Sequence, residues 1–412
     1  MRLAVISEHA SPLAALGGED SGGQNVYVAE MARRLGAMGH RVDVFTRRDD
    51  ALLPAVVPFE RGVQVVNLPA GPAEGVPKDD LFPFMGEFRD AFYRFANEEP
   101  AAYDLVHANF WMSGWVACEA KRDLGLPFAQ TFHALGEIKK REQGAADTSP
   151  PERRAAEFRI LKEADRVLTT CPAEVEELTS LYGAEPSRLT LVPCGVDARK
   201  FRPVDRGKAR QKLGLPDKPT IVYVGRLVPR KGVDTLVEAF ALLPDHLDAQ
   251  LVIVGGEPRA VEISPEEGRL STLAERLGVR ERVAFTGSRP QEELRRYYGA
   301  GDVAVTVPHY EPFGMTPLEA MSCAKPVVGS RVGGIKTSVA DGKTGHLVPP
   351  KDPEALAGRL LRLLSDENLR DHMGRAARRR IKEHYTWEHV ARLAAAAFSE
   401  VAVGTPRISK TA

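Results

Sequence analysis

Cysteine is scarce in this sequence, and the few residues present are scattered. Among the 412 residues there are four cysteines, and no two of them form a C-x-x-C pair. Disulfide frameworks and structural zinc sites need closely spaced cysteines, so neither is expected. The pattern suits a reducing compartment, and we expect a cytoplasmic protein.

Long apolar runs are also missing. No stretch reaches the roughly 20 apolar residues of a membrane-spanning helix. The N-terminus enters a strand-like run at Leu3–Ile6 without the features of a secretory signal. We therefore expect no transmembrane segment and no export, which leaves peripheral membrane contact open.

Neither sign of charge dominates. The chain holds 56 lysines and arginines against 56 aspartates and glutamates. Without an overall field to draw the protein onto nucleic acid, charged ligands must be met by local groups. We expect small-molecule partners and no nucleic acid, and the oligomeric state stays open.

Short apolar runs alternate with longer segments of helical period, which is typical of parallel α/β sheets. The predicted strands are Leu3–Ile6, Val42–Phe45, Val63–Leu68, Leu105–Ala108, Phe128–Phe132, Val167–Thr170, Leu189–Pro193, Thr220–Gly225, Leu251–Val254, Val283–Phe285, Val303–Val307, Val327–Val328 and His346–Val348. The alternation pauses in the loop-rich segment 194–219. Because the length suits two domains of about 150 to 200 residues, we predict Rossmann-like doubly wound domains at 1–195 and 196–385. A helix at 386–404 and a flexible tail at 405–412 follow.

Open sheets of this kind bind ligands at the carboxyl ends of their strands. The glycine-rich stretch 17–25 precedes a predicted helix at Val26–Met38, so the backbone amides around Gly22 and Gly23 suit an anion. An ordinary flexible turn is the plainer interpretation. The stretch is not a dinucleotide fingerprint, because G-x-G-x-x-G is absent from the sequence.

A cationic loop follows the run that ends at Gly225. Arg226 and Lys231 lie between this strand and a predicted helix at Val233–Leu243. A guanidinium fork, an ammonium group and a helix N-terminus together suit a phosphate. The loop is not a Walker A motif, since Gly232 follows Lys231, and a solvated basic loop is the alternative.

Two glutamates, Glu311 and Glu319, belong to a third candidate stretch. Thr316 with Glu319 three residues later is a capping-box pattern, and Pro317 suits the first helical position, so a helix is predicted to begin here. Capping alone would explain Glu319. Glu311 lies at a strand end without a capping role, which favours contact with a ligand.

Histidines end two of the predicted strands. His133 follows Phe128–Phe132, and His107 ends the strand before it. A lone histidine is more often a packing residue than a catalytic one. The position of His133 at the carboxyl end of a strand nevertheless favours a functional role.

Together these stretches resemble the retaining glycosyltransferases of family four, which have the GT-B fold. The resemblance covers nearly the whole chain and is carried by the segments 22–28, 192–197, 224–232, 311–321, 333–335 and 341–348. It implies two domains that face each other across a cleft, with the final helix packed on the first. The nearest subgroup contains sucrose-phosphate synthase and the inositol-phosphate N-acetylglucosaminyltransferase.

The resemblance also implies roles for individual residues. His133, Arg226, Lys231 and Glu311 correspond to the catalytic group, and the donor site comprises Gly22, Gly23, Arg226, Lys231, Gly314, Met315, Thr316 and Glu319. Arg226 and Lys231 would contact the donor diphosphate. Glu319 would bind the ribose, and Glu311 the donor sugar.

The acceptor is expected to be a small polar sugar or polyol, with or without a phosphate. The resemblance implies an acceptor site at Asn25, Lys78, Phe110, Trp111 and Arg154, where Lys78 would meet the phosphate. A solvated surface charge is the alternative for Lys78. Phe110 stands where the inositol-phosphate enzymes have tyrosine, and Ala134 where they have a hydroxyl residue, which removes two hydrogen bonds to a phosphate.

We expect a hexosyltransferase that retains anomeric configuration and needs neither metal nor cofactor beyond its nucleoside diphosphate sugar. The cationic loop can stabilise the leaving diphosphate, and no D-x-D carboxylate pair occurs. Three alternatives remain: a nucleotide-sugar epimerase or glycan synthase of the same fold, a non-catalytic sugar-binding protein, and a nicotinamide-dependent dehydrogenase. The last two are disfavoured by the missing export signal and the missing glycine fingerprint, respectively.

Overall fold

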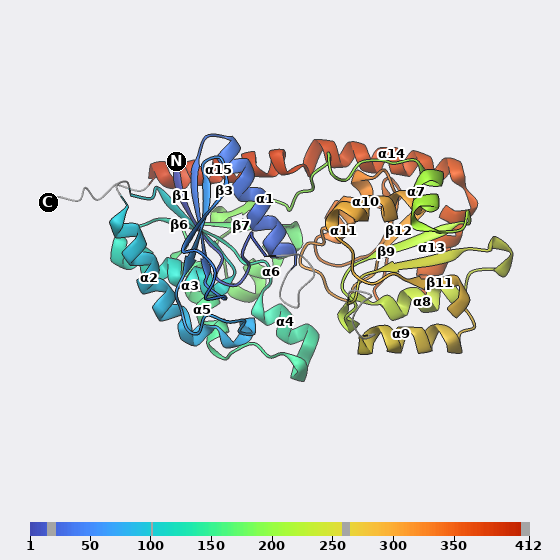
Figure 1. The fold of residues 1–412 in the computed structure, drawn as a ribbon, viewed down its shortest axis with the longest axis horizontal. Coiled ribbons are helices and arrows are strands. Elements are labelled where there is room, and N and C mark those ends of the chain that lie inside the picture. Colours follow the sequence, from blue (N-terminus) through green and yellow to red (C-terminus); the bar gives the residue numbers. More distant parts are fainter. Residues whose placement is uncertain (15–21, 100–101, 258–263, 405–412) are drawn as a thin grey trace. The chain divides into compact units, whose positions relative to one another are not determined.

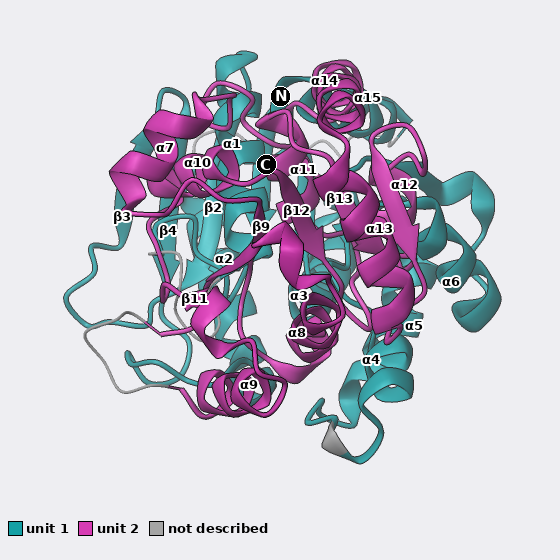
Figure 2. Ribbon diagram, turned by 90° about the vertical axis from the view of Figure 1, so that its right-hand side faces the viewer, with its two compact units in different colours: residues 1–193, 387–412 teal, residues 194–386 magenta. Residues whose placement is uncertain are grey.

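The computed structural model describes residues 1–14, 22–99, 102–257 and 264–404. The chain forms two compact units, Met1–Pro193 with Trp387–Ala412, and Cys194–Thr386 (Figure 2). Most of the predicted glycine-rich loop, 17–21, and the predicted tail, 405–412, lie outside the described residues.

Unit 1 contains an eight-stranded sheet in the order β3-β4-β2-β1-β5-β6-β7-β8. Its strands are β1 Arg2–Ile6, β2 Arg41–Arg47, β3 Val56–Glu60, β4 Val63–Leu68, β5 Leu105–Asn109, β6 Phe128–Thr131, β7 Arg166–Thr169 and β8 Leu189–Leu191. Every residue of β1 and β5 is buried, as expected for strands covered on both faces. The seven strands predicted for this unit are all present.

One strand of unit 1 was not predicted. β3 pairs with β4 in the antiparallel direction at the sheet edge, and its residues alternate between exposed and partly buried positions. Pro58 lies within it, at a register shift of the pair, and proline within sheets is confined to edge strands, strand starts and bulges. The weak apolar pattern of β3 therefore reflects its edge position.

The helices of unit 1 cover both faces of the sheet (Figure 1). They are α1 Gly23–Ala37, α2 Met85–Glu98, α3 Trp111–Leu124, α4 Gly136–Gln143, α5 Glu152–Glu163, α6 Pro172–Tyr182 and α15 Trp387–Gly404, with a short 3-10 turn, η1, at Lys78–Asp80. α15 packs on α1 and beside β5, β6 and β7. Its Trp387 lies edge-on against Tyr27 of α1, and its Phe398 contacts the ring of His107.

Unit 2 contains a six-stranded parallel sheet in the order β11-β10-β9-β12-β13-β14. Its strands are β9 Thr220–Val224, β10 Gln250–Val254, β11 Val283–Phe285, β12 Val303–Thr306, β13 Val327–Ser330 and β14 Gly345–Val348. All six strands predicted for this half of the chain are present.

Helices also cover both faces of the sheet of unit 2. They are α7 Arg206–Leu213, α8 Val233–Ala241, α9 Pro265–Arg276, α10 Gln291–Ala300, α11 Thr316–Ser322, α12 Ile335–Ser338, α13 Pro353–Ser365 and α14 Glu367–His384. α8 packs against α9 and α13, whereas α10 packs against α7, and α11 against α14.

The strand orders show where each sheet can bind a ligand. In unit 1 the order reverses between β1 and β5, and in unit 2 between β9 and β12. Loops that leave the carboxyl ends of such neighbouring strands run to opposite faces, which opens a crevice. Candidate ligand groups are therefore expected after β1 and β5, and after β9 and β12.

Candidate active site

At the reversal point of unit 2, the loop after β9 meets the loop after β12. Nζ of Lys231 forms an ion pair with Oε2 of Glu311, and the guanidinium of Arg230 lies 3.9 Å from the same oxygen. Burial lowers the pKa of Lys231, and Glu311 opposes this effect. Burial would raise the pKa of Glu311, but Lys231 and Arg230 hold it below its ordinary value. The unit thus presents a carboxylate between two cations.

Backbone geometry fixes this pairing. The 3-10 turn η5, Pro229–Lys231, ends at Gly232, which has φ of +65°. A Cβ atom at Gly232 would lie 2.1 Å from the carbonyl oxygen of Val307, just after β12. The amide of His309 donates to the carbonyl of Arg230 at 2.8 Å. Only glycine therefore allows the two loops to approach this closely.

Glu319 has a role other than the predicted cap. α11 begins at Thr316 with Met315 at its N-cap and no side-chain cap hydrogen bond, so the predicted capping box is wrong. The carboxylate of Glu319 instead accepts a hydrogen bond of 2.8 Å from the hydroxyl of Tyr298. Burial raises the pKa of Glu319 to about 7, and the hydrogen bond from Tyr298 opposes the shift. A buried carboxyl that is held by a neutral hydroxyl rather than by a cation is suited to ligand binding.

The other predicted donor residues of unit 2 lie in the same two loops. Arg226 is exposed, and its carbonyl accepts a hydrogen bond from the hydroxyl of Tyr223 at 3.1 Å. Gly314 lies against the Cγ atom of Glu311, and Met315 leads into α11. The structure therefore gathers Arg226, Lys231, Glu311, Gly314, Met315, Thr316 and Glu319 in the loops and helix that follow β9 and β12.

In unit 1, α1 begins three residues earlier than predicted. Gly22 is its N-cap, and the amide of Gly22 donates to Oδ1 of Asn25 at 2.9 Å. Nδ2 of Asn25 donates to the carbonyl of Ser11 at 3.0 Å. Asn25, predicted to meet the acceptor, thus fixes the start of α1, with Gly23 as the first helical residue. The side chain of Gln24 donates to the carbonyl of Asn109.

Two residues at the carboxyl edge of unit 1 have unusual backbone conformations. Phe110 has φ of +83° and His133 has φ of +60°, values that cost a non-glycine residue on the order of 1–3 kcal/mol. The amide of Phe110 donates to the carbonyl of Thr131 at 2.8 Å, and its carbonyl accepts from Gln130. Strain held by such bonds is typical of functional sites.

Hydrogen bonds assign the tautomer of His133. The amide group of Asn109 donates to the carbonyls of Ile6 and His107, so its Oδ1 is an acceptor. This oxygen lies 3.0 Å from Nε2 of His133, which must therefore donate. Burial, assisted by His107 and His9, lowers the pKa of His133 to about 3. A neutral His133 thus keeps Nδ1 as an acceptor.

The other residues predicted to bind the acceptor differ in their surroundings: one is buried and two are at least partly exposed. Trp111 is the first residue of α3, and its buried ring packs against Phe82 with the ring centroids 4.9 Å apart. Lys78 is partly exposed and pairs with Asp79 at 3.3 Å. Arg154 is 67% exposed and pairs with Glu137.

Lys78 belongs to a wider network that the sequence did not predict. Asp79 also pairs with Lys139 at 3.2 Å and accepts a hydrogen bond from Thr148. Burial would raise the pKa of Asp79, but Thr148, Lys78 and Lys139 lower it to about 2. Asp79 is therefore ionised and holds Lys78 and Lys139 near each other.

Arg153 rather than Arg154 lies beside the strained edge of unit 1. Its guanidinium stands over the ring of Phe110, 5.1 Å from the centroid, and donates to the carbonyl of Ala134 at 2.8 Å. It also forms a buried ion pair with Glu157. The helical period of α5 could have separated the buried Arg153 from the exposed Arg154, but sequence alone does not show which face carries the site.

His107 is a packing residue. It is buried, and its Nε2 lies 3.0 Å from the hydroxyl of Thr131. Burial lowers its pKa to about 3. The neighbouring β5 and β6 therefore do not present both histidines to one ligand site, and the interpretation of His107 as a packing residue is the better one.

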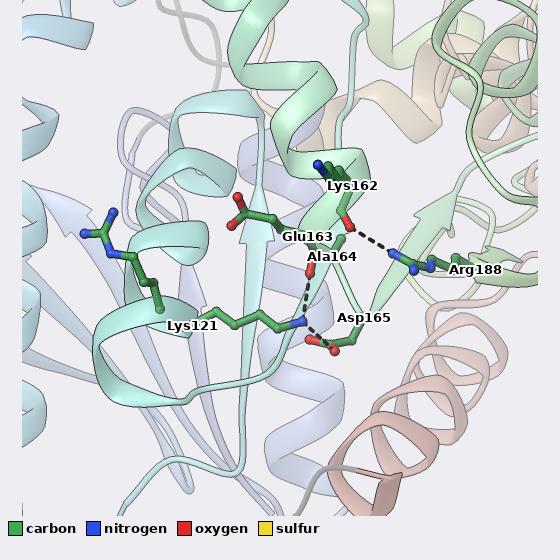
Figure 3. A pocket seen from close by; sticks show the side chains of 7 residues that line it. Lys121, Lys162, Glu163, Ala164, Asp165 and Arg188 are labelled. Carbon is green, nitrogen blue, oxygen red and sulfur yellow. Dashed lines mark hydrogen bonds and ion pairs between the residues drawn. The ribbon is translucent and has the colours of Figure 1, made fainter.

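A separate cavity of unit 1 lies away from these groups. It has a volume of about 440 Å³ and is lined by residues that include Lys121, Lys162, Asp165 and Arg188 (Figure 3). Asp165 immediately precedes β7 and accepts a hydrogen bond from the amide of Phe128, the first residue of β6. The cavity is thus at the amino ends of these strands, opposite the candidate site. Lys121 and Arg188 are already bonded to the carbonyls of Glu163 and Lys162.

Two further observations concern metal ions and membranes. Among residues 1–14, 22–99, 102–257 and 264–404, no group of three or more His, Cys, Asp or Glu side chains could hold a metal ion. Within those same ranges, every helix is too short or too polar to cross a membrane.

Comparison with known proteins identifies the family. The model described as "Glycosyltransferase Family 4" matches residues 21–200, and that described as "Glycosyl transferases group 1" matches residues 205–380. A D-inositol 3-phosphate glycosyltransferase of Acidothermus cellulolyticus is 42% identical over 384 residues, which cover 91% of this chain and 85% of that protein. Another, from Kribbella flavida, is 38% identical over 408 residues, with 96% and 95% covered.

A solved structure agrees. Sucrose-phosphate synthase from Thermosynechococcus elongatus matches with a TM-score of 0.88 and 36% identity, covering 97% of this chain and 98% of that one. The chain therefore belongs to the family-four glycosyltransferases, and its two Rossmann-like units are those of the GT-B fold. This confirms the family and fold class that the sequence motifs predicted.

Proposed function

We propose that this glycosyltransferase moves a hexose, with retention of anomeric configuration, from a nucleoside diphosphate sugar to a hydroxyl group of a small phosphorylated sugar or polyol. The proposal that the protein binds such a donor rests on the cationic loop after β9, where Lys231 forms an ion pair with Glu311. A diphosphate that leaves the sugar gains negative charge, and Arg226 and Lys231 are suited to receive it. One well-placed donor to such an anion typically contributes roughly 3 kcal/mol.

Retention follows from the chemistry proposed for this loop. The acceptor oxygen attacks the anomeric carbon on the face that the diphosphate leaves, and a diphosphate oxygen takes the hydroxyl proton. Arg226 and Lys231 would hold that diphosphate, while Glu311 would orient the sugar. The neutral His133 would accept a hydrogen bond from the sugar through Nδ1. Metal chemistry has no part in this proposal.

The proposal that the acceptor carries a phosphate is supported by Lys78 and by the names of similar proteins. Lys78 and Lys139 both form ion pairs with Asp79, which keeps their ammonium groups close together. D-inositol 3-phosphate and sucrose phosphate, after which two similar proteins are named, both carry a phosphate. Two neighbouring ammonium groups suit such an anion.

An unphosphorylated acceptor is the second candidate. Phe110 and Ala134 provide no hydroxyl group at the edge beside Arg153, so two hydrogen bonds to a phosphate cannot form there. At roughly 1.5–3 kcal/mol for each bond to a charged group, this loss could reverse the preference.

Product analysis tests the proposal directly. UDP-, GDP- and ADP-glucose should each be incubated with inositol, fructose, inositol 3-phosphate and fructose 6-phosphate. A new glycosidic bond to an acceptor supports transfer, whereas an isomerised donor alone would support an epimerase. NMR of the anomeric centre reports retention, and activity that a chelator abolishes and Mg²⁺ restores would contradict metal independence.

Lys78→Ala tests the acceptor phosphate. The variant should lose the preference for phosphorylated over plain acceptors while its turnover with plain acceptors is kept. Lys140→Ala, at an exposed position of α4, is the matched control and should keep the preference. If Lys78→Ala keeps it as well, the phosphate site is elsewhere.

A further inference from the structure

His133 lies at the centre of a strained turn. The amide of Ala134 donates to the carbonyl of Phe132 at 2.7 Å, so residues 132–134 form a γ-turn around His133. His133 has φ of +60°, and a γ-turn with positive φ at its centre is rare and strained. Such a conformation persists only where neighbouring groups hold it. The turn therefore needs support from the segment that follows it.

That segment is the start of α4, which has no cap of its own. Its N-cap is Leu135, an apolar residue that cannot accept a hydrogen bond. The first amides of a helix have no partner within the helix. α4 has eight residues, and an isolated helix of fewer than about 12 residues is marginal in water. The start of α4 therefore depends on acceptors from elsewhere in unit 1.

Two side chains from α5 and α6 supply these acceptors. The amide of Gly136 donates to the carboxylate of Glu157, at 3.0 and 3.1 Å from its two oxygens. The amide of Glu137 donates to the hydroxyl of Tyr182 at 3.0 Å. A carboxylate beside a helix N-terminus is also favoured by the helix dipole. α4 is thus capped by residues that are distant from it in the sequence.

The two capping side chains are joined to each other and to Arg153. The hydroxyl of Tyr182 donates to Oε2 of Glu157 at 2.6 Å, and Nε of Arg153 donates to Oε1 at 2.8 Å. Burial and Glu157 raise the pKa of Tyr182, so its hydroxyl stays protonated. Nη2 of Arg153 donates to the carbonyl of Ala134, directly after His133. Glu157 is fully buried, so the loss of a partner would leave a poorly compensated charge.

The capped segment connects two parts of the proposed site. His133, expected at the transferred sugar, precedes the cap by three residues. Lys139 follows the cap in the first turn of α4, and its ammonium group pairs with Asp79, which also pairs with Lys78. A displacement of the start of α4 would therefore move both His133 and Lys139.

We propose that Glu157 and Tyr182 are positioning residues, which cap α4 from α5 and α6 and thereby hold His133 in its strained turn and Lys139 beside the acceptor phosphate. The inference rests on the proposed function, because it needs a transferred sugar and a phosphorylated acceptor. Neither residue has to touch a substrate. Their loss acts on the reaction through the segment 133–139.

Tyr182→Phe is the primary variant. It keeps the ring, which packs 5.0 Å from that of Phe158, and removes only the hydroxyl. It should lower kcat/KM for transfer about tenfold, as expected for a lost hydrogen bond to a charged group, and should reduce the preference for phosphorylated acceptors. The amide of Glu137 should exchange its hydrogen faster. The dissociation constant of UDP, GDP or ADP, whichever belongs to the accepted donor, should stay within about twofold of wild type.

Tyr103→Phe is the matched control. The hydroxyl of Tyr103 donates to Asp43 at 2.6 Å, and Asp43 pairs with Arg2 at 3.0 Å. Tyr103 is 5% exposed and Tyr182 is 6% exposed. Arg2 begins β1, so this second network lies at the amino end of the strand, opposite the candidate site. Tyr103→Phe should lower stability to a similar degree without changing kcat/KM or the preference between acceptors.

Glu157→Gln tests whether the two capping residues act together. It keeps one oxygen that can accept from Gly136 but removes the charge that pairs with Arg153. It should also lower kcat/KM for transfer. Tyr182→Phe placed in this background should have a smaller effect than in wild type, because both substitutions weaken the same cap.

The outcomes separate this inference from the proposed function. If wild-type enzyme joins glucose to none of the four acceptors named above, the proposed function fails and the inference with it. If wild type transfers glucose but Tyr182→Phe is no slower than Tyr103→Phe, the inference alone is overturned. Fully additive effects of Tyr182→Phe and Glu157→Gln would also overturn it, because the two residues would then not act through one cap.

Discussion

At the scale of single residues, two buried glutamates of unit 2 have opposite electrostatic surroundings. Glu311 is stabilised as a carboxylate by Lys231 and Arg230, whereas Glu319 is held by the neutral hydroxyl of Tyr298. Glu311 is thus charged across the physiological range, and Glu319 changes charge within it. We therefore expect different effects at the two sites. Substitutions in the cationic loop beside Glu311 should change turnover, whereas Glu319 should change how stability depends on pH.

Removing the leaving-group contacts should abolish most turnover without unfolding the protein. Arg226→Ala and Lys231→Ala should each reduce kcat at least about a hundredfold, because a donor to the departing diphosphate is lost. Arg230→Ala, in the same loop, is the control and should have a smaller effect. Steady-state kinetics with circular dichroism checks both statements, and near wild-type kcat in the first two variants would remove the site assignment.

Glu319 should make stability depend on pH. Its pKa rises from 4.5 to about 7 on folding, so the folded state binds the extra proton between these values. The free energy of unfolding should therefore fall as pH rises from about 4.5 to 7, by up to roughly 3 kcal/mol. Glu319→Gln should lack this component. Urea unfolding of both proteins at pH 5 and pH 8 measures it, and parallel pH profiles would contradict the shift.

At the scale of elements, the approach of η5 to the end of β12 depends on Gly232. Gly232→Ala should destabilise unit 2 by more than about 2 kcal/mol and weaken nucleotide binding, because Cβ would collide with the carbonyl of Val307. Gly214 is the matched control: its φ of +66° is nearly the same, but beyond its chain neighbours no described atom lies within 4 Å of the position that a Cβ would take. Gly214→Ala should cost only the conformational term of about 1 kcal/mol. Equal losses of stability in the two variants would show that the structure relieves the collision at residue 232.

The elements also show how far sequence reasoning reaches. Buried parallel strands are continuous apolar runs, so all of them were predicted, whereas the half-exposed edge strand β3 was missed. The loops after β9 and β12 were found because charge and glycine concentrate there. Arg153 and Lys139 were missed because single basic residues within helices form no motif. Their contacts with Phe110 and Asp79 depend on tertiary packing.

At the scale of the whole molecule, the proposed donor and acceptor groups belong to different units, and the chain passes between the units at 193–194 and 386–387. Transfer requires both sets of groups at one sugar, so we expect donor and acceptor together to favour a closed arrangement. Small-angle X-ray scattering should show a smaller radius of gyration with both substrates than without them. An unchanged radius under saturating conditions would argue against closure.

The last described helix has a consequence for biosynthesis. Unit 2 is one uninterrupted segment of chain, whereas unit 1 is completed by α15, whose Trp387 and Phe398 are buried against α1 and β5, elements that precede unit 2 in the chain. While the ribosome synthesises unit 2, the nascent N-terminal segment must therefore carry an uncovered apolar face. That face closes only after α15 has left the exit tunnel, so unit 1 begins before unit 2 on the ribosome and is completed after it.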